Sequence, residues 1–522
     1  MSTNTTGGKP GLKRVLSLWG LVIYGIILVQ PTAAMPIYGI ISDKAHGHVI
    51  TTILIAMVAM LFTAISYGRM ANAYPSAGSA YTYVGQELHP ALGHLTGWAM
   101  VFDYMLNPIL SVMFCSYTAR RVLNPVILWT LQHWLGWQSA PEVPYWLWAV
   151  VFAALFTGMN LRAIEASART NQWIAAALMA VVVWFLLAAG CYIWTDPGAA
   201  AGRFWRPFYD PQSFDLKLVS SGAAVAMLTY IGFDAISTLS EEAYNPRRNI
   251  LLATVLTCVV TGILAGTQVY AAGVVWPSNQ FADPPTAFSD IAREAGTALP
   301  IPVSAAARGA ALFVTVSLAL LVAQIGSGAG AHMAGGRLLY GMGRDNAIPR
   351  RFFAAINPRT RIPHYNIMLI GAIALVGGLL GCVEQVTISL PKLTVAKPWG
   401  LGFVWTTEQM QPFDLACELL NFGALIGFMG VNLAALARYY VRGANKKNLW
   451  NLLLPLAGFL ICLYLWYNLF LVAKVAGLAW LAGGFAYGAW KTRWFRNKIE
   501  FSVPDDESDP EPSPSPSGRG PG

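Results

Sequence analysis

The chain has 522 residues and a formal net charge of +9, with 56% hydrophobic and 11% charged residues. Soluble domains carry about 25% charged residues, so this composition excludes a soluble enzyme. Apolar stretches of about 20 residues recur along almost the whole chain, and a helix needs this length to cross a bilayer. The sequence therefore predicts a polytopic membrane protein surrounded by lipid.

Basic residues can indicate a nucleic-acid partner, but membrane proteins also carry Lys and Arg in their cytoplasmic loops. The apolar composition favours the second explanation. The six cysteines lie in or beside apolar segments without a Cys-x-x-Cys pair, so we expect buried thiols. His46 and His48 stand beside Asp43, but no further ligand lies nearby in the sequence. Neither a metal site nor a cofactor is predicted.

The pattern of apolar stretches predicts an all-α fold with twelve membrane helices. Their approximate spans are 16–41, 49–68, 91–118, 144–161, 171–194, 218–240, 249–275, 307–336, 366–383, 413–437, 449–468 and 470–490. The first stretch also has the features of a signal peptide, with Ala33 and Ala34 at a possible cleavage site. We favour a membrane helix because Pro36 follows at once and apolar sequence continues to Ile41.

Three regions are expected to lie outside the helical bundle. Residues 1–15 form a cytoplasmic N-terminal segment, and residues 491–522 form a cytoplasmic tail that ends acidic and rich in Pro, Ser and Gly. Such a composition cannot bury enough apolar area to fold, so we expect the tail to be largely disordered. Residues 384–412 are predicted to form a long external loop, and the transport domain covers 16–490.

Loop charges predict the orientation in the membrane. With a cytoplasmic N-terminus, the cytoplasmic segments hold 23 Lys and Arg residues and the external segments hold 11. This bias favours cytoplasmic N- and C-termini. We expect a multi-pass protein of the cell membrane.

Two of the predicted helices are interrupted. Helix 1 contains Pro31 and Pro36, which free the carbonyl groups of Ile27 and Thr32. Helix 6 contains Gly232 and an acid within its span. Freed backbone groups need partners inside the protein or beside water, and paired broken helices are typical of transporters with inverted repeats. We therefore expect a five-plus-five inverted repeat.

The expected repeats cover about 16–194 and 218–437, and two additional helices cover 449–490. No GxxxxGK[ST] phosphate loop and no HExxH motif occur in the sequence. The chain is therefore predicted to be a secondary transporter and not an enzyme.

Four segments carry a family resemblance: TYIGFDAISTLSEEAYNPRRNI (229–250), YPSAGSAYTYVGQELHPALGHLTGW (74–98), NLRAIEASARTNQ (160–172) and GRLLYGMGRDNAIPRRF (336–352). Together they resemble the amino acid–polyamine–organocation (APC) superfamily, and in motif they are most similar to its cationic amino acid transporter branch. The resemblance covers roughly residues 15–490 and keeps the order of the family's motifs. It implies the broken-helix transporter fold and alternating access.

The resemblance also implies a substrate-binding site at the two breaks, where exposed backbone holds the α-amino and α-carboxyl groups of a substrate. Mapped onto this chain, the site residues are Gln30, Pro31, Thr32, Ala33, Tyr230, Ile231, Gly232, Phe233 and Asp234. Phe233 stands where the family places an aromatic residue over the substrate. The first break departs from the family, because Gln30-Pro31-Thr32 replaces the usual Gly-small-Gly run. This departure suggests an amine or polyamine as the alternative substrate.

Asp103 is the candidate for ion coupling. It lies well inside the third apolar stretch, where an acid is costly unless it is paired, solvated or protonated. Burial favours the neutral form, as a proton carrier requires. The family resemblance supports this, because many members have a Glu before Tyr at this place. Sodium coupling stays open, with Ser317 or Ser327 as possible ligands.

Arg337, Arg344 and Asp345 are candidates for a cytoplasmic gate, or else they only anchor the topology. The sequence thus predicts a proton-coupled importer of amino acids, with a polyamine or amine importer or exchanger as the alternative. A channel or a non-transporting nutrient sensor is the alternative of another class. The partners are a small-molecule substrate, a proton and lipid, and the oligomeric state stays open.

Overall fold

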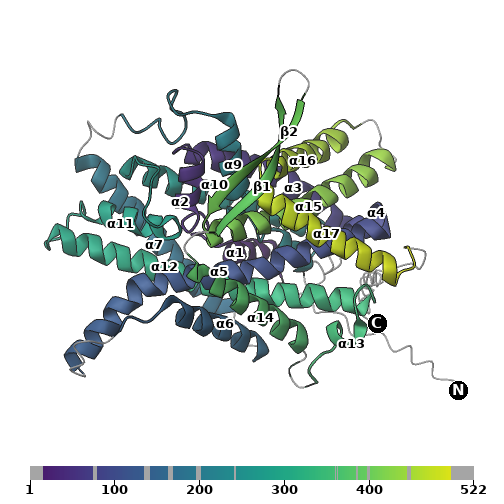
Figure 1. The fold of residues 1–522 in the computed structure, drawn as a ribbon, viewed down its shortest axis with the longest axis horizontal. Coiled ribbons are helices and arrows are strands. Elements are labelled where there is room, and N and C mark those ends of the chain that lie inside the picture. Colours follow the sequence, from purple (N-terminus) through teal and green to yellow (C-terminus); the bar gives the residue numbers. More distant parts are fainter. Residues whose placement is uncertain are drawn as a thin grey trace, which may run out of the picture.

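The computed structural model describes residues 16–74, 79–134, 141–162, 168–195, 202–239, 243–358, 360, 362–383, 386–396, 400–443 and 448–494. The expected N-terminal segment and most of the expected tail lie outside these residues. Within them the chain forms a bundle of helices with one β-hairpin (Figure 1).

The longer helices follow one another with short connections. In chain order they are α1 (Leu18–Val29), α2 (Tyr38–Lys44), α3 (Val49–Ala73), α4 (Ser79–Glu87), α5 (Pro90–Trp134), α6 (Tyr145–Leu161), α7 (Ala168–Thr195), α9 (Leu216–Ala226), α10 (Pro246–Val275), α11 (Ala287–Gly296), α12 (Ala305–Arg344), α13 (Arg350–Phe353), α14 (His364–Leu379), α15 (Pro412–Leu436), α16 (Trp450–Tyr467) and α17 (Leu471–Lys491). Short turns of 3-10 helix are η1 (Met227–Thr229), η2 (Asp234–Leu239), η3 (Pro284–Thr286) and η4 (Leu380–Cys382), and a π-helical turn is η5 (Ala437–Val441).

Local signals start several of these helices. The side chains of Ser17, Asp215 and Ser304 accept backbone N–H groups at the first turns of α1, α9 and α12. Proline occupies the first turn of α10 and α15, where its missing N–H costs nothing. The middle part of each long helix is apolar. In lipid the backbone of such a segment must satisfy its own hydrogen bonds, and a helix does so.

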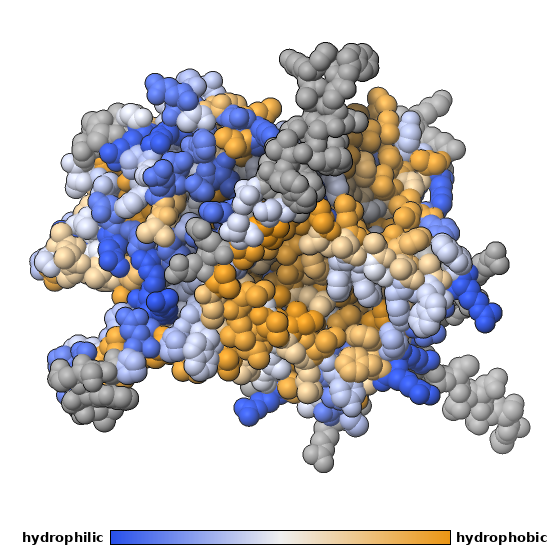
Figure 2. All heavy atoms as spheres, in the orientation of Figure 1, coloured by the Kyte–Doolittle hydropathy of each residue, from blue (hydrophilic) through white to orange (hydrophobic). Residues whose placement is uncertain are grey.

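Among the described residues, nine helices are long and apolar enough to cross a membrane. Shorter apolar helices at Leu18–Val29, Tyr145–Leu161 and Leu216–Thr229 occupy the remaining predicted positions. Figure 2 shows one face of the molecule, where apolar side chains gather in the middle and hydrophilic ones gather towards the two long ends. This distribution fits a polytopic membrane protein.

The core of the bundle is built around α3, α5, α10, α12 and α15. α10 packs along α3, and α5 packs against both α12 and α15. Small residues permit this approach: a Cβ at Gly68 would lie 2.5 Å from the Leu251 Cα, and a Cβ at Gly423 would lie 2.7 Å from the Ala99 carbonyl oxygen. Membrane helices pack through small residues because lipid gives them no hydrophobic driving force.

Both expected helix breaks are present. α1 ends at Val29, residues 30–37 form turns, and α2 begins at Tyr38. In the sixth span, α9 and η1 end at Thr229, and η2 begins at Asp234 after a non-helical stretch. Gln30 and Gly232 have φ values of 71° and 119°, so one residue at each break adopts a left-handed backbone.

Two expectations about element boundaries were wrong. Residues 386–410, predicted as part of an external loop, form an antiparallel hairpin in which β1 (Val386–Ala396) pairs with β2 (Gly400–Met410). The third helix, predicted to end near residue 118, continues to Trp134 as α5. Arg120 and Arg121 end the apolar stretch but not the helix, because arginine is a good helix former.

The expectation of six buried thiols was also partly wrong. Cys115, Cys258, Cys417 and Cys462 are buried, but Cys191 is half-buried and Cys382 is exposed. The histidine pair has a structural environment: His48 is buried, its Nδ1 lies 2.7 Å from the Ala45 carbonyl oxygen, and its Nε2 accepts the Asp210 N–H at 3.1 Å.

Candidate functional site

A small internal cavity lies where the two broken helices meet. Its volume is about 70 Å³. The lining residues come from the first break, from α5, from the sixth span, from α12 and from α15: Leu28, Val29, Gln30, Ala33, Pro36, Ile37, Asn107, Leu110, Ser111, Phe114, Leu228, Ile231, Gln324, Ser327, Phe413, Cys417 and Leu420. Ligand sites typically measure 300–1,000 Å³, so the wall must move to admit a ligand.

The polar groups that line the cavity are amides and hydroxyls. Ser111 donates to Gln324 at 3.3 Å and lies 3.5 Å from the Asn107 side-chain oxygen. Gln30 donates through Nε2 to the Ala323 carbonyl, which ties the first break to α12. None of the described residues that line the cavity carries a charge at neutral pH. The cavity therefore offers hydrogen bonds but no counter-ion of its own.

The first break is held by neighbouring helices. Gln268 of α10 donates to the Pro31 carbonyl at 2.8 Å, and the Met35 N–H donates to the Thr32 carbonyl at 3.0 Å. These bonds satisfy carbonyl groups in a stretch where the helix cannot. The Thr32 carbonyl, which the sequence predicts to be freed by Pro36, is thus paired within the turn.

The second break is organised by Asp234. Its Oδ1 accepts the Gly232 N–H at 3.2 Å, and its Oδ2 accepts the Tyr104 hydroxyl at 3.0 Å. Gly232 also touches the first break, because a Cβ there would lie 3.3 Å from Val29 Cγ2. A carboxylate of the chain therefore accepts a backbone N–H at the second break, just before η2.

The predicted site residues divide into two groups. Gln30, Ala33 and Ile231 line the cavity, whereas Pro31, Thr32, Tyr230, Gly232, Phe233 and Asp234 do not. Tyr230 is buried and donates to the Ile53 carbonyl at 3.0 Å. Phe233 is fully buried, with its ring 5.6 Å from that of Tyr67 and 5.5 Å from that of Phe428. In this conformation Phe233 belongs to an aromatic cluster and not to the cavity wall.

Asp103 lies one helical turn from the cavity and directly before Tyr104, which donates to Asp234. It is 3% exposed, and the turn after it on the same helix brings Asn107 into the wall. A Cβ at Gly423 would lie 3.2 Å from the Asp103 Cβ, so Asp103 packs against α15. Its charge interacts with that of Asp234. No hydrogen bond or ion pair joins the Asp103 carboxyl group to another described residue.

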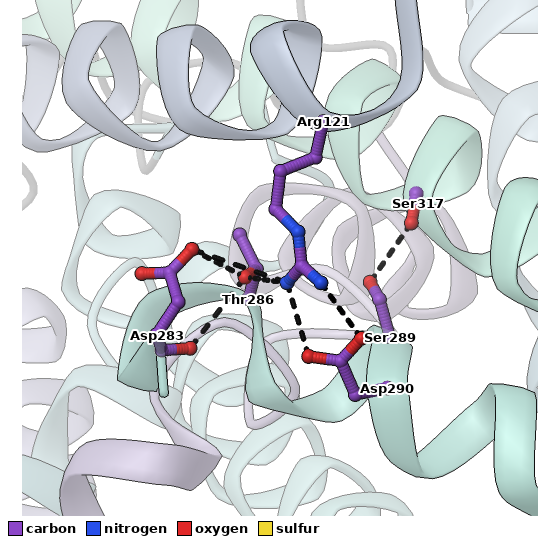
Figure 3. A network of polar contacts seen from close by, with 6 residues as sticks. All are labelled: Arg121, Asp283, Thr286, Ser289, Asp290 and Ser317. Atoms are coloured by element: carbon purple, nitrogen blue, oxygen red, sulfur yellow. Dashed lines mark hydrogen bonds and ion pairs between the residues drawn. The ribbon is translucent and has the colours of Figure 1, made fainter. Parts of the chain in front are cut away.

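Charged networks lie at both ends of the bundle, which we name after α4 and α11 (Figure 1). At the α11 end, Arg121 of α5 donates two hydrogen bonds to Asp290, at 2.8 and 3.0 Å. It also donates to Thr286 and lies 3.9 Å from Asp283 (Figure 3). Ser289 and Ser317 join α11 to α12 at 2.9 Å. Burial raises the pKa of Asp283 above its ordinary value, although Thr286 and Arg121 act in the opposite direction.

At the α4 end, Glu87 pairs with Arg438 at 2.5 Å and with Arg442 at 3.1 Å. Tyr74 donates to Glu87 at 2.7 Å, and burial followed by the Glu87 contact raises the pKa of Tyr74 to about 12. These residues line an open cavity of about 470 Å³. They connect α4 to the end of α15.

The gate candidates Arg337, Arg344 and Asp345 lie at the same end. Arg337 and Arg344 are exposed, and the Arg344 Nε lies 3.7 Å from the Asp345 Oδ1. The sequence alone did not point to Glu87 or Arg438, nor to the amides of Asn107 and Gln324. Polar residues inside apolar helices were the available signal.

The chain matches the family model described as "Amino acid permease" over residues 20–476. It is 31% identical over 508 residues to the low-affinity putrescine importer PlaP of Escherichia coli (strain K12), covering 96% of this chain and 98% of that protein. It is also 26% identical to the methylthioribose transporter of Bacillus subtilis (strain 168), covering 91% and 92%. The branched-chain amino acid permease BcaP of the same strain is 25% identical, covering 92% and 93%. The chain therefore belongs to the amino acid permease family within the APC superfamily, and it is a multi-pass transporter of amino acids or amines.

Proposed function

We propose that the substrate is a small organic amine, of which an α,ω-diamine is the leading example, and that the protein imports it by alternating access. The observation that carries this proposal is the position of Asp234. Its carboxylate accepts the Gly232 N–H at the second break. A substrate carboxylate placed there would meet a charge of its own sign, whereas an ammonium group would be attracted.

Three further features support an amine. The cavity wall contains no cationic side chain among the described residues, and the amide oxygens of Asn107 and Gln324 can accept hydrogen bonds from an ammonium group. Gln30 stands where the family usually has a small residue, and its side chain is committed to the Ala323 carbonyl. Asp103 adds a second acid beside Asp234. The 31% identity to a putrescine importer agrees with this chemistry.

We further propose that the importer lies in the cell membrane with the α4 end and both termini in the cytoplasm. The excess of Lys and Arg in the corresponding segments supports this orientation. The two repeats would cover about 16–194 and 218–437, with α16 and α17 outside them. In this arrangement the α11 end faces the outside, and the substrate passes between the two breaks.

Proton coupling through Asp103 completes the proposal. An acid that is almost fully buried beside a second acid is stable only if it exchanges its charge with protons or with a cation. Arg337, Arg344 and Asp345 would contribute to closing the cytoplasmic side, together with the ion pairs of Glu87.

Uptake into proteoliposomes tests the function. Radiolabelled putrescine should accumulate saturably under an inward proton gradient and exchange with unlabelled putrescine, whereas leucine and arginine should enter more slowly. Faster uptake of the amino acids would overturn the choice of substrate class. Uptake without saturation would indicate a channel, and binding without uptake would indicate a sensor.

A further inference from the structure

A second polar cluster lies at the α11 end of the cavity. Lys44, the last residue of α2, places its ammonium 2.5 Å from Oε1 of Glu418 in α15. The two side chains are 10% and 0% exposed. The ammonium also lies 3.5 Å from the centre of the Phe470 ring, and the Phe470 N–H donates to the other Glu418 oxygen at 3.1 Å. A carboxylate and an aromatic face thus enclose one ammonium group.

This cluster contains three carboxyl groups and one ammonium group among the described residues. Asp43 and Asp414 both interact electrostatically with Lys44. Oδ1 of Asp414 is buried and has no hydrogen-bond partner among the residues that the structure describes. Buried polar atoms in native proteins are nearly always paired, and an unpaired carboxylate oxygen is especially costly. The carboxyl groups of the cluster can therefore bind a second cation, and Asp414 Oδ1 can accept a hydrogen bond from it.

The cluster adjoins the cavity wall. Phe413 and Cys417 line the cavity, and Asp414 and Glu418 directly follow them in α15. Ile37, just before α2, also lines the cavity. An amine that approaches from the α11 end would meet these carboxylates before it reaches the amides of the cavity.

We propose that this cluster is an ammonium-binding site at the entrance of the pathway, and that Lys44 holds the place of the ammonium group of an incoming amine. The amine displaces Lys44 from Glu418 and stacks on Phe470, while Asp414 accepts the released Lys44 ammonium. Both cations stay paired throughout, so the exchange avoids a bare buried charge. The inference rests on the proposed amine substrate.

Chemical rescue tests the site in the purified full-length protein. The Lys44→Met variant removes the ammonium and keeps an apolar side chain, so it leaves Glu418 unpaired and should unfold at a lower temperature. Ethylammonium chloride should then raise its Tm by roughly 2 °C more than it raises the wild-type Tm, relative to sodium chloride at equal ionic strength. Lys44→Met combined with Glu418→Gln should show no such gain.

Lys474→Met is the matched control. Lys474 also lies near an aromatic ring, 5.2 Å from the centre of Tyr467, and donates to the Tyr467 carbonyl at 2.7 Å. Its response to ethylammonium should equal that of the wild type. An equal response of Lys44→Met and the wild type would overturn the proposal.

Lys44→Arg covers the case in which Lys44→Met does not fold. The guanidinium keeps the charge and can hold Glu418 through two hydrogen bonds, so the KM for putrescine should rise at least threefold while kcat changes little. An unchanged KM would overturn the site. If ethylammonium rescues Lys44→Met selectively but the wild type does not take up putrescine, the amine importer is refuted and the ammonium site is supported. If the wild type takes up putrescine but ethylammonium does not rescue Lys44→Met selectively, the ammonium site is refuted and the amine importer is supported.

Discussion

At the scale of single residues, Asp234 has two roles that a substitution can separate. Its side chain accepts the Gly232 N–H, and its negative charge would attract an amine. Asp234→Asn keeps an oxygen for the Gly232 N–H, which the carboxylate accepts at 3.2 Å, but removes the charge. A hydrogen bond to a charged group contributes about 1.5–3 kcal/mol. We therefore expect the KM for putrescine to rise roughly 10-fold to 150-fold, with little change in Tm. Initial uptake rates and thermal unfolding measure the two effects, and an unchanged KM would show that Asp234 only starts η2.

Gly232 is the residue on which the second break depends. Its φ of 119° is rarely adopted by any L side chain, and an added Cβ would also press on Val29 Cγ2 at 3.3 Å. Such strain costs about 1–3 kcal/mol, so Gly232→Val should abolish uptake while folded protein remains in the membrane. Fluorescence-detected size exclusion measures the folded fraction.

Gly190→Val is the control for this substitution, because a Cβ at Gly190 meets nothing within 4 Å. It should transport like the wild type. Undiminished transport by Gly232→Val would mean that the break does not require this backbone conformation.

The sequence predicted the special residues at the second break but not their partners. A glycine and an acid two residues apart are unusual inside an apolar span, so the sequence alone identifies Gly232 and Asp234 as a possible helix break. The contact of Gln30 with the Ala323 carbonyl joins residues 293 positions apart, and a single sequence contains no information on such pairing. The same reason explains why Asn107 and Gln324 were missed.

At the scale of elements, η3 and α11 pack against α2 at the α11 end of the bundle, and we name these two elements the cover. Gly39 of α2 packs against the Pro284 carbonyl, and the rings of Tyr38 and Phe288 lie 5.7 Å apart. Arg121 fastens this cover to α5 through Asp290 (Figure 3). Phe114, two turns before Arg121 on the same helix, lines the cavity beneath.

Arg121→Gln should loosen the cover. A bidentate pair between arginine and a carboxylate is among the stronger polar contacts, so its loss should expose Cys417, which lines the cavity and is 1% exposed. In a Cys382→Ser background, a membrane-impermeant thiol reagent should label Cys417 at least threefold faster.

Arg293→Gln is the matched control for Arg121→Gln. Arg293 lies on the same cover, 4.1 Å from the centre of the Phe313 ring, and its loss should leave the labelling rate unchanged. Equal rates in Arg121→Gln and the wild type would show that the ion pair does not hold the cover.

Asp283 of the same cover gives a prediction for pH. Burial raises its pKa in the folded protein, so above the ordinary pKa of aspartate the folded state binds more protons than the unfolded state. Stability from this group therefore falls as the pH rises through the raised pKa. Asp283→Asn removes this loss while keeping an acceptor for Thr286, which bonds Asp283 at 2.6 Å. Its Tm should depend less on pH above about 4, the ordinary pKa of aspartate, than the wild-type Tm. A steeper dependence in the variant would contradict this.

Helices were easier to predict than their surroundings. Hydropathy identifies only the apolar part of a helix. The predicted third helix therefore stopped near residue 118, before Arg120 and Arg121, although α5 continues to Trp134. The hairpin was missed because residues 384–412 connect two apolar helices and were predicted to form a loop. Its β-branched residues, such as Val386, Thr387 and Ile388, were the signal that could have found it.

At the scale of the whole molecule, a cavity of about 70 Å³ sits between two charged networks. At the α11 end, Arg121 ties α5 to the cover, and Lys44 ties α2 to α15. At the α4 end, Glu87 ties α4 to the end of α15. Alternating access requires these ties to open in turn, so that a substrate reaches the cavity from one side only. The broken helices predict this architecture from the amino-acid sequence. The ion pairs at the two ends join residues that are distant in the sequence, so only the structure reveals them.

Coupling is the property that links the two ends. Asp103 and Asp234 are each 3% exposed, and Tyr104, the residue after Asp103, donates its hydroxyl to Asp234 at 3.0 Å. The two acids cannot both be ionised in this buried region without a compensating cation. If a proton fills this role, an empty carrier must take up a proton from the outside and release it inside together with the amine.

Asp103→Asn should therefore separate transport from coupling. The amide has the size of the acid but carries no exchangeable proton, so the variant should exchange putrescine across the membrane at near wild-type rates and lose accumulation under an inward proton gradient. Glu142→Gln, which changes an exposed acid near the start of α6, is the control and should accumulate like the wild type. Proteoliposomes with imposed proton or sodium gradients measure both processes. Accumulation by Asp103→Asn in response to the proton gradient would place coupling elsewhere, and accumulation by the wild type that needs sodium would replace the proton as the coupling ion.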